Sequence, residues 1–344
     1  MRRVKLKQGT LAWEKARETR IGSSEVFDIV KYYAEDEELQ NCGMNAEVFR
    51  AEKPYTTAWA LYHKILGDGL YHKEELAPEF AEYGHSVEPY GVHVLQRDRV
   101  KKLKPGEVFV NDRLIASLDI AGTAEEIDTL HTFDYGRGAP KAGQRFVCEQ
   151  KTMMPQMIKN GLPFKYIVQA QYQILQTKAD FFILQLMVLN EDTPFIRGKI
   201  CQMSRTKKFA YLDDNMTVGH YYFQNNEHLS RLIEVCIERF FQAVDGRCEP
   251  TPYIEYDSQQ NIIESIRLNA AYNDELIFDY DLSGFVQAKE KEEAAISERK
   301  TEQQKIVEAA KRNNVCRFYS LDGHTASFAK NGRFLVRPPK GATS

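Results

Sequence analysis

The sequence lacks the paired cysteines of a disulfide-rich or zinc-binding domain. Its six cysteines are scattered, and none has the C-x-x-C spacing of a local zinc or iron–sulfur ligand pair. Isolated cysteines in a chain of 344 residues are typical of a reducing compartment. No apolar run approaches the length of a membrane span, and no apolar secretory segment follows the basic first residues. We therefore expect a soluble, cytoplasmic protein.

An excess of basic charge is also missing. The chain has 46 lysines and arginines against 49 aspartates and glutamates, which gives a net charge of -3. Nucleic-acid-binding domains usually carry a basic face. Carboxylates that bind metal ions add negative charge locally, so nucleic acid is not excluded, but any DNA contact must come from local basic patches. Apolar residues make up 43% of the chain, enough for a large core in one large or two ordinary domains.

Hydrophobic periodicity predicts a group of strands with helices before and after it. The run from Phe181 to Asn190 is almost continuously apolar, as in a strand buried on both faces. The segment 123–144 is rich in glycine and charge, which favours a loop or an extended hairpin. This alternation indicates an α/β (α+β) fold. Helices are expected at 11–20, from Ser23 or Ser24 to 30, at 44–66, 78–97, 163–176 and 219–244, and strands at 107–111, 114–119, 146–151 and 181–190.

The chain changes character near residue 250. Residues 260–313 are charge-rich and helical in pattern, and large apolar residues become rare after Phe285. Two hairpin signals, Asp322-Gly323 and Asn331-Gly332, then separate three short strand-like pieces. We expect a core domain over residues 1–250 and, over 251–344, a helical arm with a small β-meander that docks a partner or another subunit. A solvated helix without such a role is the simpler alternative.

Three residues point to metal-dependent phosphodiester chemistry. Asp119 ends a predicted strand, whereas Glu149 and Lys151 lie two apart on another strand, so their side chains share a face and Gln150 points the opposite way. If the strands adjoin, Asp119 and Glu149 hold one Mg²⁺, which takes oxygen ligands and keeps several waters. Lys151 then orients or activates the attacking water and offsets charge on the phosphate. A strand with a solvated polar face gives the same pattern.

The surroundings of Glu149 favour the functional interpretation. Phe146, Val147 and Cys148 lead the strand out of the core, and a charged pair at the end of a buried strand is costly unless it is paired or functional. A polar face follows on the next predicted helix at i, i+3 and i+7, and its simplest explanation is exposure to solvent. This face consists of Tyr166, Gln169 and Gln173.

Short motifs occur in a fixed order along residues 5–190. They are Gln8-Gly9-Thr10-x-x-Trp13-x-x-x-Arg17 with Ile21-Gly22-Ser23-Ser24-Glu25, then Gly84-x-x-x-Glu88, Ala116-Ser117-Leu118-Asp119, Glu149-Gln150-Lys151, and Tyr166-x-x-Gln169-x-Gln171. In this order the motifs resemble the YqaJ-like viral recombinases, which include the lambda exonuclease group of the PD-(D/E)XK nuclease superfamily. Leu118 and Ile120 depart from the family, which usually has proline and glycine there.

The resemblance implies a PD-(D/E)XK core in which helices flank a central mixed sheet. It also implies a Mg²⁺-dependent deoxyribonuclease, with Mn²⁺ as an alternative ion. By this resemblance the catalytic residues are Asp119, Glu149, Lys151 and Gln169, and the metal-binding residues are Asp119, Glu149, Glu88 and Gln150.

The same resemblance assigns a DNA phosphate to Arg17, Ser24 and Ser117. Physical chemistry agrees with this assignment. The guanidinium of Arg17 is a fork-shaped donor for phosphate oxygens, and a serine at a helix N-terminus lies at the positive end of the helix dipole.

The resemblance further implies an exonuclease that digests double-stranded DNA ends from 5′ to 3′ in phage or prophage recombination, within the bacterial host cytoplasm. It implies a ring-shaped trimer and a single-strand annealing protein as partner. One alternative is a structure-selective endonuclease or nickase with the same chemistry. Another is a non-catalytic DNA-binding or annealing protein that retains the fold, against which the complete set of Asp119, Glu149 and Lys151 argues.

Overall fold

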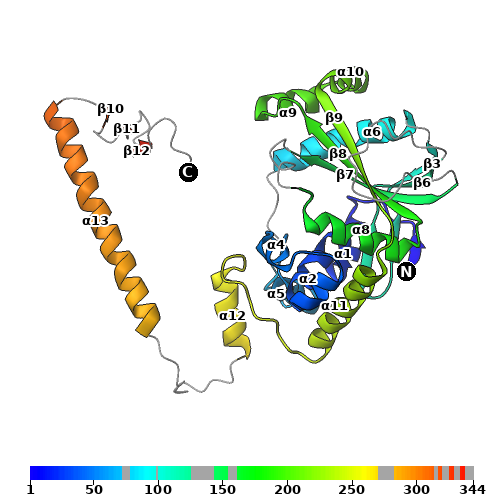
Figure 1. Ribbon diagram of the computed structural model, residues 1–344, viewed down its shortest axis with the longest axis horizontal. Coiled ribbons are helices and arrows are strands. Elements are labelled where there is room, and N and C mark those ends of the chain that lie inside the picture. The colour runs from blue at the N-terminus through cyan, green and yellow to red at the C-terminus, as the bar shows by residue number, and fades with distance from the viewer. Residues whose placement is uncertain are drawn as a thin grey trace. The chain divides into compact units, whose positions relative to one another are not determined.

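The computed structural model describes residues 1–71, 78–97, 100–124, 143–153, 161–269, 283–313, 317–319, 325–328 and 334–337. These residues belong to two compact units, Met1–Ala271 and Tyr272–Ser344 (Figure 1). The first unit contains two mixed sheets flanked by helices, and the second contains a long helix and a small antiparallel sheet. The predicted α/β class is therefore confirmed.

The larger sheet of the first unit has the strand order β3-β6-β7-β8-β9. Strands β7 and β8 run parallel, and the other neighbouring pairs are antiparallel. Every residue of β8 is buried, as its apolar run predicted, because α6 covers one face of the sheet and α8 the other (Figure 1). The elements are β3 (Val100–Pro105), β6 (Ile120–Ala124), β7 (Arg145–Met153), β8 (Phe181–Leu189), β9 (Met216–Phe223), α6 (Pro78–Arg97) and α8 (Phe164–Thr177).

The smaller sheet joins the start of the chain to its middle. Its order is β1-β4-β5-β2, in which β2 and β5 are parallel and the remaining pairs are antiparallel. A small cluster of buried valines and isoleucine packs on it together with the half-buried Trp13 of α1. The elements are β1 (Arg2–Val4), α1 (Leu11–Glu18), β2 (Ile21–Gly22), β4 (Val108–Val110) and β5 (Leu114–Ser117).

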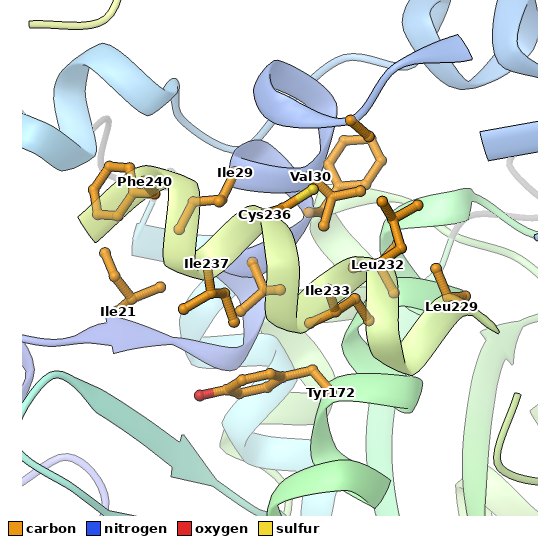
Figure 2. Packing of buried hydrophobic residues seen from close by; sticks show 14 of the residues in the cluster. Ile21, Ile29, Val30, Tyr172, Leu229, Leu232, Ile233, Cys236, Ile237 and Phe240 are labelled. Atoms are coloured by element: carbon orange, nitrogen blue, oxygen red, sulfur yellow. The ribbon is translucent and has the colours of Figure 1, made fainter. Parts of the chain in front are cut away.

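A layer of helices covers α8 on the side away from the larger sheet. Its centre is α11 (Glu227–Asp245), whose apolar residues recur every three to four positions and pack on α2 (Val26–Tyr33), as Figure 2 shows. Asn226 caps α11 by accepting a 3.1 Å hydrogen bond from the backbone N–H of Leu229. Tyr172 of α8 enters this cluster from below α11 in the same view. The core of the first unit therefore spans from the sheet through α8 to α11.

Shorter helices complete the first unit. The face of the larger sheet that carries α6 is extended by α9 and α10, which connect β8 to β9 and share a buried cluster with α6. On the opposite side, α5 begins at its cap Thr57 and ends at Gly67, whose left-handed backbone stops the helix. The remaining bounds are η1 (Ser23–Glu25), α3 (Asp36–Asn41), α4 (Ala46–Ala51), α5 (Ala58–Leu66), α9 (Pro194–Gln202), α10 (Arg205–Asn215) and α12 (Gln259–Asn269).

The segment from 251 to 269 is attached to the rest of the first unit by side-chain hydrogen bonds. Thr57 Oγ1 donates to Asp257 over 2.6 Å, and Asn261 donates to the Leu70 carbonyl over 2.9 Å. Ser265 of α12 donates to the Glu249 carboxylate over 2.7 Å. These contacts attach α12 to α5 and its flanking loops.

The second unit contains α13 (Ser283–Asn313) and three antiparallel strands, β10 (Arg317–Tyr319), β11 (Thr325–Phe328) and β12 (Phe334–Arg337). They match the expected charge-rich helix and terminal meander. The hairpin signals at 322–323 and 331–332 lie outside the described residues. Within the described part of the chain, no helix combines the length and apolar character needed to cross a membrane.

The structure corrects two predicted helices. The stretch 44–66 forms two helices, α4 and α5, because Pro54 and the loop around it interrupt the pattern. The stretch 219–244 begins with strand, since Tyr221 and Tyr222 belong to β9, and only its later part is α11. The helix predicted to start at Ser23 or Ser24 starts as the short 3-10 turn η1, whose preceding residue is Gly22. Most of the loop expected at 123–144 lies outside the described residues.

Gly91 allows α6 to approach the larger sheet closely. A Cβ atom at this position would collide with the Gln150 amide and lie 2.6 Å from Gln185 Oε1. We expect Gly91→Ala to lower the free energy of unfolding by about 1–3 kcal/mol, as overpacking of a dense core does. Urea denaturation measures the change. Gly198→Ala on α9 is the matched control, because no atom lies within 4 Å of its added Cβ. It should stabilise the chain by about 0.5–1 kcal/mol, and equal effects of the two variants would contradict the packing argument.

Candidate active site

Asp119 lies where the chain passes from the smaller sheet to the larger one. It follows β5 and directly precedes β6, which pairs with β7 from Arg145 to Cys148. Beyond that point β6 no longer runs beside β7, and the Asp119 carboxylate accepts the Gln150 backbone N–H over 2.8 Å. Continuing the β6–β7 register by one residue places Asp119 opposite Glu149. The structure thus brings Asp119 beside Glu149, and the strand that adjoins β7 is β6 rather than β5.

Glu149 and Lys151 share the face of β7 that is covered by α8, as their i, i+2 spacing predicted. Lys151 Nζ lies 2.7 Å from Glu149 Oε1. Glu149 is buried, whereas a quarter of the Lys151 side chain is exposed. The Lys151 ammonium also lies 5.9 Å from the ring centre of Tyr166 on α8. A carboxylate and an ammonium are thus held together at the rim of the sheet.

The charges of this site are not balanced by the protein alone. Burial raises the pKa of Asp119 well above its usual value, and the neighbouring Glu149 carboxylate raises it further. Lys151 opposes this effect only in part. For Lys151, burial lowers the pKa, but the nearby carboxylates of Glu149 and Asp119 outweigh burial, so its pKa is raised overall. Two close carboxylates with one ammonium form a site that an added cation would stabilise.

The donor set fits a hard divalent cation. Carboxylate oxygens of Asp119 and Glu149 are the donors, and Mg²⁺ is commonly bound by one or two carboxylates together with waters and substrate phosphate. Among the described residues, no group of three or more His, Cys, Asp and Glu side chains converges on one point. Glu88 on α6 is half exposed and hydrogen-bonds His85 over 3.1 Å, yet it is near enough for its charge to raise the pKa of Asp119. Glu88 therefore lies beside the pair rather than within it.

Glutamines of α8 are buried rather than exposed to solvent, and one of them contacts the site. Gln169 is buried, one turn before Gln173, which donates to Glu149 Oε2 over 3.1 Å. The amide oxygen of Gln173 is buried and has no hydrogen-bond partner among the described residues. Gln173 is thus the helix residue that contacts the carboxylate, whereas the motif had singled out Gln169. The i, i+4 spacing of the two glutamines was the available signal, but a solvent-exposed face gives the same spacing.

The opposite face of β7 carries a neutral polar network that the sequence did not reveal. The amides of Gln150 and Gln185 lie 2.6 Å apart, and Gln185 reaches His220 Nε2 over 3.0 Å and the Gly91 carbonyl over 3.3 Å. With its amide turned end for end, Gln150 also contacts the Glu88 carbonyl of α6. The side chain of Gln150 is therefore committed to this network, which leaves its backbone carbonyl as the only route to a metal ion.

The candidate phosphate-binding residues come together at the N-terminal elements. Trp13 Nε1 donates to Ser117 Oγ over 2.7 Å, which joins α1 to the end of β5. The Arg17 guanidinium lies over the Trp13 ring at 4.9 Å and stands 3.7 Å from the Glu25 carboxylate. Ser24 precedes Glu25 in η1. The structure therefore gathers Arg17, Ser24 and Ser117 near the strand that leads to Asp119.

A buried ion pair supports the turn that holds Ser24. Lys64 of α5 contacts both oxygens of Glu25 at 2.7 and 2.8 Å, and Glu25 in turn accepts the Gly22 backbone N–H over 2.7 Å. Lys64 also donates to the Arg20 carbonyl over 2.8 Å. Both charged side chains are less than a tenth exposed. This pair was not predicted from the sequence, because a helical pattern around Lys64 does not show which residue lies opposite its ammonium.

Comparisons with known proteins give only distant similarity. No protein-family model matches the chain, and no curated protein matches it. The chain is similar to the crystal structure of an alkaline exonuclease, LHK-Exo, from Laribacter hongkongensis, with 15% identity, a TM-score of 0.41, and coverage of 75% of this chain and 100% of that one. It is also similar to a phage-related exonuclease from Haemophilus somnus 129PT, with 10% identity, a TM-score of 0.41, and coverage of 68% and 97%.

LHK-Exo in complex with dAMP gives a TM-score of 0.38 at 14% identity, over 69% of this chain and 94% of that one. All of these scores are low.

Lys64→Met tests the support of the N-terminal turn. The substitution leaves the buried Glu25 carboxylate without its main partner, and we expect it to lower the free energy of unfolding by about 3–5 kcal/mol. Urea denaturation followed by circular dichroism measures the change. Arg97→Met is the control, because its pair with Asp213 is largely exposed and should contribute no more than about 1 kcal/mol. A loss at Lys64 as small as that at Arg97 would contradict the assigned role.

Proposed function

We propose that this chain is a divalent-metal-dependent DNA nuclease of the PD-(D/E)XK type. The observation that carries the proposal is the meeting of Asp119, Glu149 and Lys151 at the rim of β7, where one backbone hydrogen bond and one 2.7 Å ion pair hold them. Two adjacent carboxylates suit a metal ion, and an ammonium beside them suits an anionic substrate. A structural ion pair alone would not require the second, desolvated carboxylate of Asp119.

In this proposal Asp119 and Glu149 hold Mg²⁺, or Mn²⁺ in its place. When bound, the ion polarises the scissile phosphate and lowers the pKa of a bound water. Lys151 extends from β7 with part of its side chain open to solvent, so its ammonium reaches the phosphate or the attacking water as a hydrogen-bond donor. Gln173 holds one oxygen of Glu149 and thereby orients the carboxylate. Glu88 and the Gln150 backbone carbonyl would accept hydrogen bonds from waters bound to the ion.

The sequence motifs support a more specific proposal for the substrate, the polarity of digestion and the partners. They favour an exonuclease that digests duplex DNA ends from 5′ to 3′ in a phage or prophage recombination system, with a ring-shaped trimer and a single-strand annealing protein as partner. The described part of α13 presents mostly charged, exposed residues, which leaves it free for such docking. An endonuclease or nickase would cut covalently closed circular DNA, whereas an exonuclease would require a linear end. Parallel digestion of both substrates therefore separates these activities.

Removing either carboxylate should abolish hydrolysis. We expect Asp119→Asn and Glu149→Gln each to lower the rate of nucleotide release from linear duplex DNA by at least about a hundredfold, the usual scale for losing one preorganised electrostatic contact. Chelation with EDTA should stop the unmodified protein equally. Asp245→Asn is the control carboxylate, since its exposed side chain pairs only with Arg113 in the contacts described. Near-normal rates in both site variants would remove the catalytic assignment.

Arg17 should confer a preference for a 5′-phosphorylated end. A charge-assisted hydrogen bond contributes about 1.5–3 kcal/mol, which corresponds to a preference of about tenfold or more over a 5′-hydroxyl end. Arg17→Ala should erase that preference and slow initiation while internal steps of digestion proceed normally. Initial rates on the two kinds of duplex end measure the effect. Equal digestion of both ends by the unmodified protein would show that these residues do not form a phosphate site.

A further inference from the structure

A cavity of 280 Å³ lies within the first unit, next to the candidate active site. The chain segments 53–60 and 255–261 form most of its wall, and Leu70 closes it. Three aromatic side chains line it, namely Tyr55, Trp59 and Tyr256, and Lys53 contributes a positive charge. Tyr55 and Tyr256 keep 44% and 41% of their surface exposed. Exposed aromatic rings around a hollow are unusual unless they meet a ligand.

The wall of the cavity is held by buried polar contacts. The Asp28 carboxylate accepts the backbone N–H groups of Tyr55 and Thr56 at 3.1 and 3.2 Å. Asp257 accepts the Thr57 hydroxyl at 2.6 Å and the Tyr253 backbone N–H at 2.7 Å. The two segments are thus fixed to each other without filling the space between them. The cavity is therefore preformed, which reduces the entropy that binding would cost.

Tyr55 connects this cavity to the catalytic residues. Its ring lines the cavity, and its side chain lies next to Tyr166, the tyrosine whose ring faces the Lys151 ammonium. The Lys165 ammonium lies over the Tyr55 ring at 4.5 Å. Next to the cavity, Glu52 accepts the first free N–H groups of α8 from Phe164 and Lys165, which attaches this loop to the start of the helix. A ligand held at Tyr55 would therefore stand close to the group cleaved at Glu149.

The chemistry of the wall favours a nucleobase. A volume of 280 Å³ is just below the roughly 300–1,000 Å³ of sites for larger organic ligands, which suits a single flat ring system. Aromatic rings stack on every base, while lysines beside them bind the connecting phosphates. Lys53 and Lys165 supply such charges. Two acids line the cavity, and the carboxylate of one of them, Asp257, is already hydrogen-bonded to the wall, which leaves Glu255 as the other negative charge.

We propose that this cavity receives one unpaired base of the DNA strand whose phosphate lies at Asp119 and Glu149. The inference rests on the proposed nuclease function and adds a binding site to it. Tyr55 is then a substrate-positioning residue, since stacking on its ring sets how far the strand advances past Lys151. If the cavity instead served a protein segment or a small metabolite, the affinity for DNA would not depend on any single base.

The test measures DNA binding without hydrolysis. Fluorescence anisotropy in EDTA reports the affinity for short single-stranded DNA with a 5′-phosphate, and for a series of the same strand with one abasic site moved along it. We expect one position at which loss of the base weakens binding about tenfold, the scale of one base–aromatic stack. Tyr55→Leu should weaken binding of the intact strand by the same factor and make binding insensitive to that abasic site. Tyr256→Leu should act at the same or the adjacent position.

Matched variants isolate the ring. Tyr55→Phe keeps the stacking surface and should bind normally, and Phe195→Leu, which removes a 79% exposed ring from α9, should change nothing. The absence of any sensitive position in the unmodified protein would overturn the inference. It would also be overturned if Tyr55→Leu and the abasic site together weakened binding by the product of their separate factors, because the ring and the base would then act independently. Normal hydrolysis of DNA without such a position would refute only the proposal that the cavity binds a base. Position-dependent binding by a chain that never hydrolyses DNA would refute the nuclease function and leave the base site standing.

Discussion

The hydrogen bond from the Gln150 backbone N–H to Asp119 determines where the two sheets of the first unit meet. Asp119 ends the path of the smaller sheet through β5, and β6 of the larger sheet starts at the next residue. The Asp119 backbone is held as well, because its carbonyl accepts the Gly106 N–H over 3.1 Å. The Asp119 carboxylate therefore accepts a backbone N–H of β7 just beyond the last residue of β6 that pairs with this strand. The ion pair of Glu149 and Lys151 lies next to this junction on β7.

The two faces of β7 solve the problem of buried polarity differently. Toward α6, the amides of Gln150 and Gln185 satisfy each other and can be fully buried because they are neutral. Toward α8, Glu149 and Lys151 are charged, and complete burial of such a pair is costly even when it is well formed. The partial exposure of Lys151 relieves that cost. The face toward α8 therefore combines charged side chains with access to solvent at Lys151, and chemistry on an anionic substrate requires both.

The sequence was sufficient wherever the determining forces were local. The almost continuous apolar run of β8, interrupted only by Gln185, predicted a strand covered on both faces, and the period-two spacing of Glu149 and Lys151 predicted their shared face. It failed where two interpretations gave the same pattern. Tyr221 and Tyr222 suit either a buried helix or a buried strand, and in the structure they belong to β9, which pairs antiparallel with β8.

Partners that lie far apart in the chain were beyond any local pattern. Nothing near Lys64 indicates that Glu25 lies opposite it, and nothing near Gln173 indicates that it faces Glu149 rather than water. Gly91 is another example, since its requirement for a missing side chain arises from Gln150 and Gln185 on two different strands. Such contacts appear only once the sheet and its covering helices are assembled.

The pairing of β1 and β2 with β4 and β5 also imposes an order on biosynthesis. Arg2 pairs with Val110 and Ile21 with Leu114, while Trp13 and its partner Ser117 are 104 residues apart. β1 and β2 therefore leave the ribosome well before the strands with which they pair, and contacts of such separation form slowly. The rim of β7 in turn lacks its parallel neighbour until β8 has been synthesised. A nascent chain thus carries Asp119 and Glu149 before it can hold them together, so the candidate site forms only when most of the first unit exists.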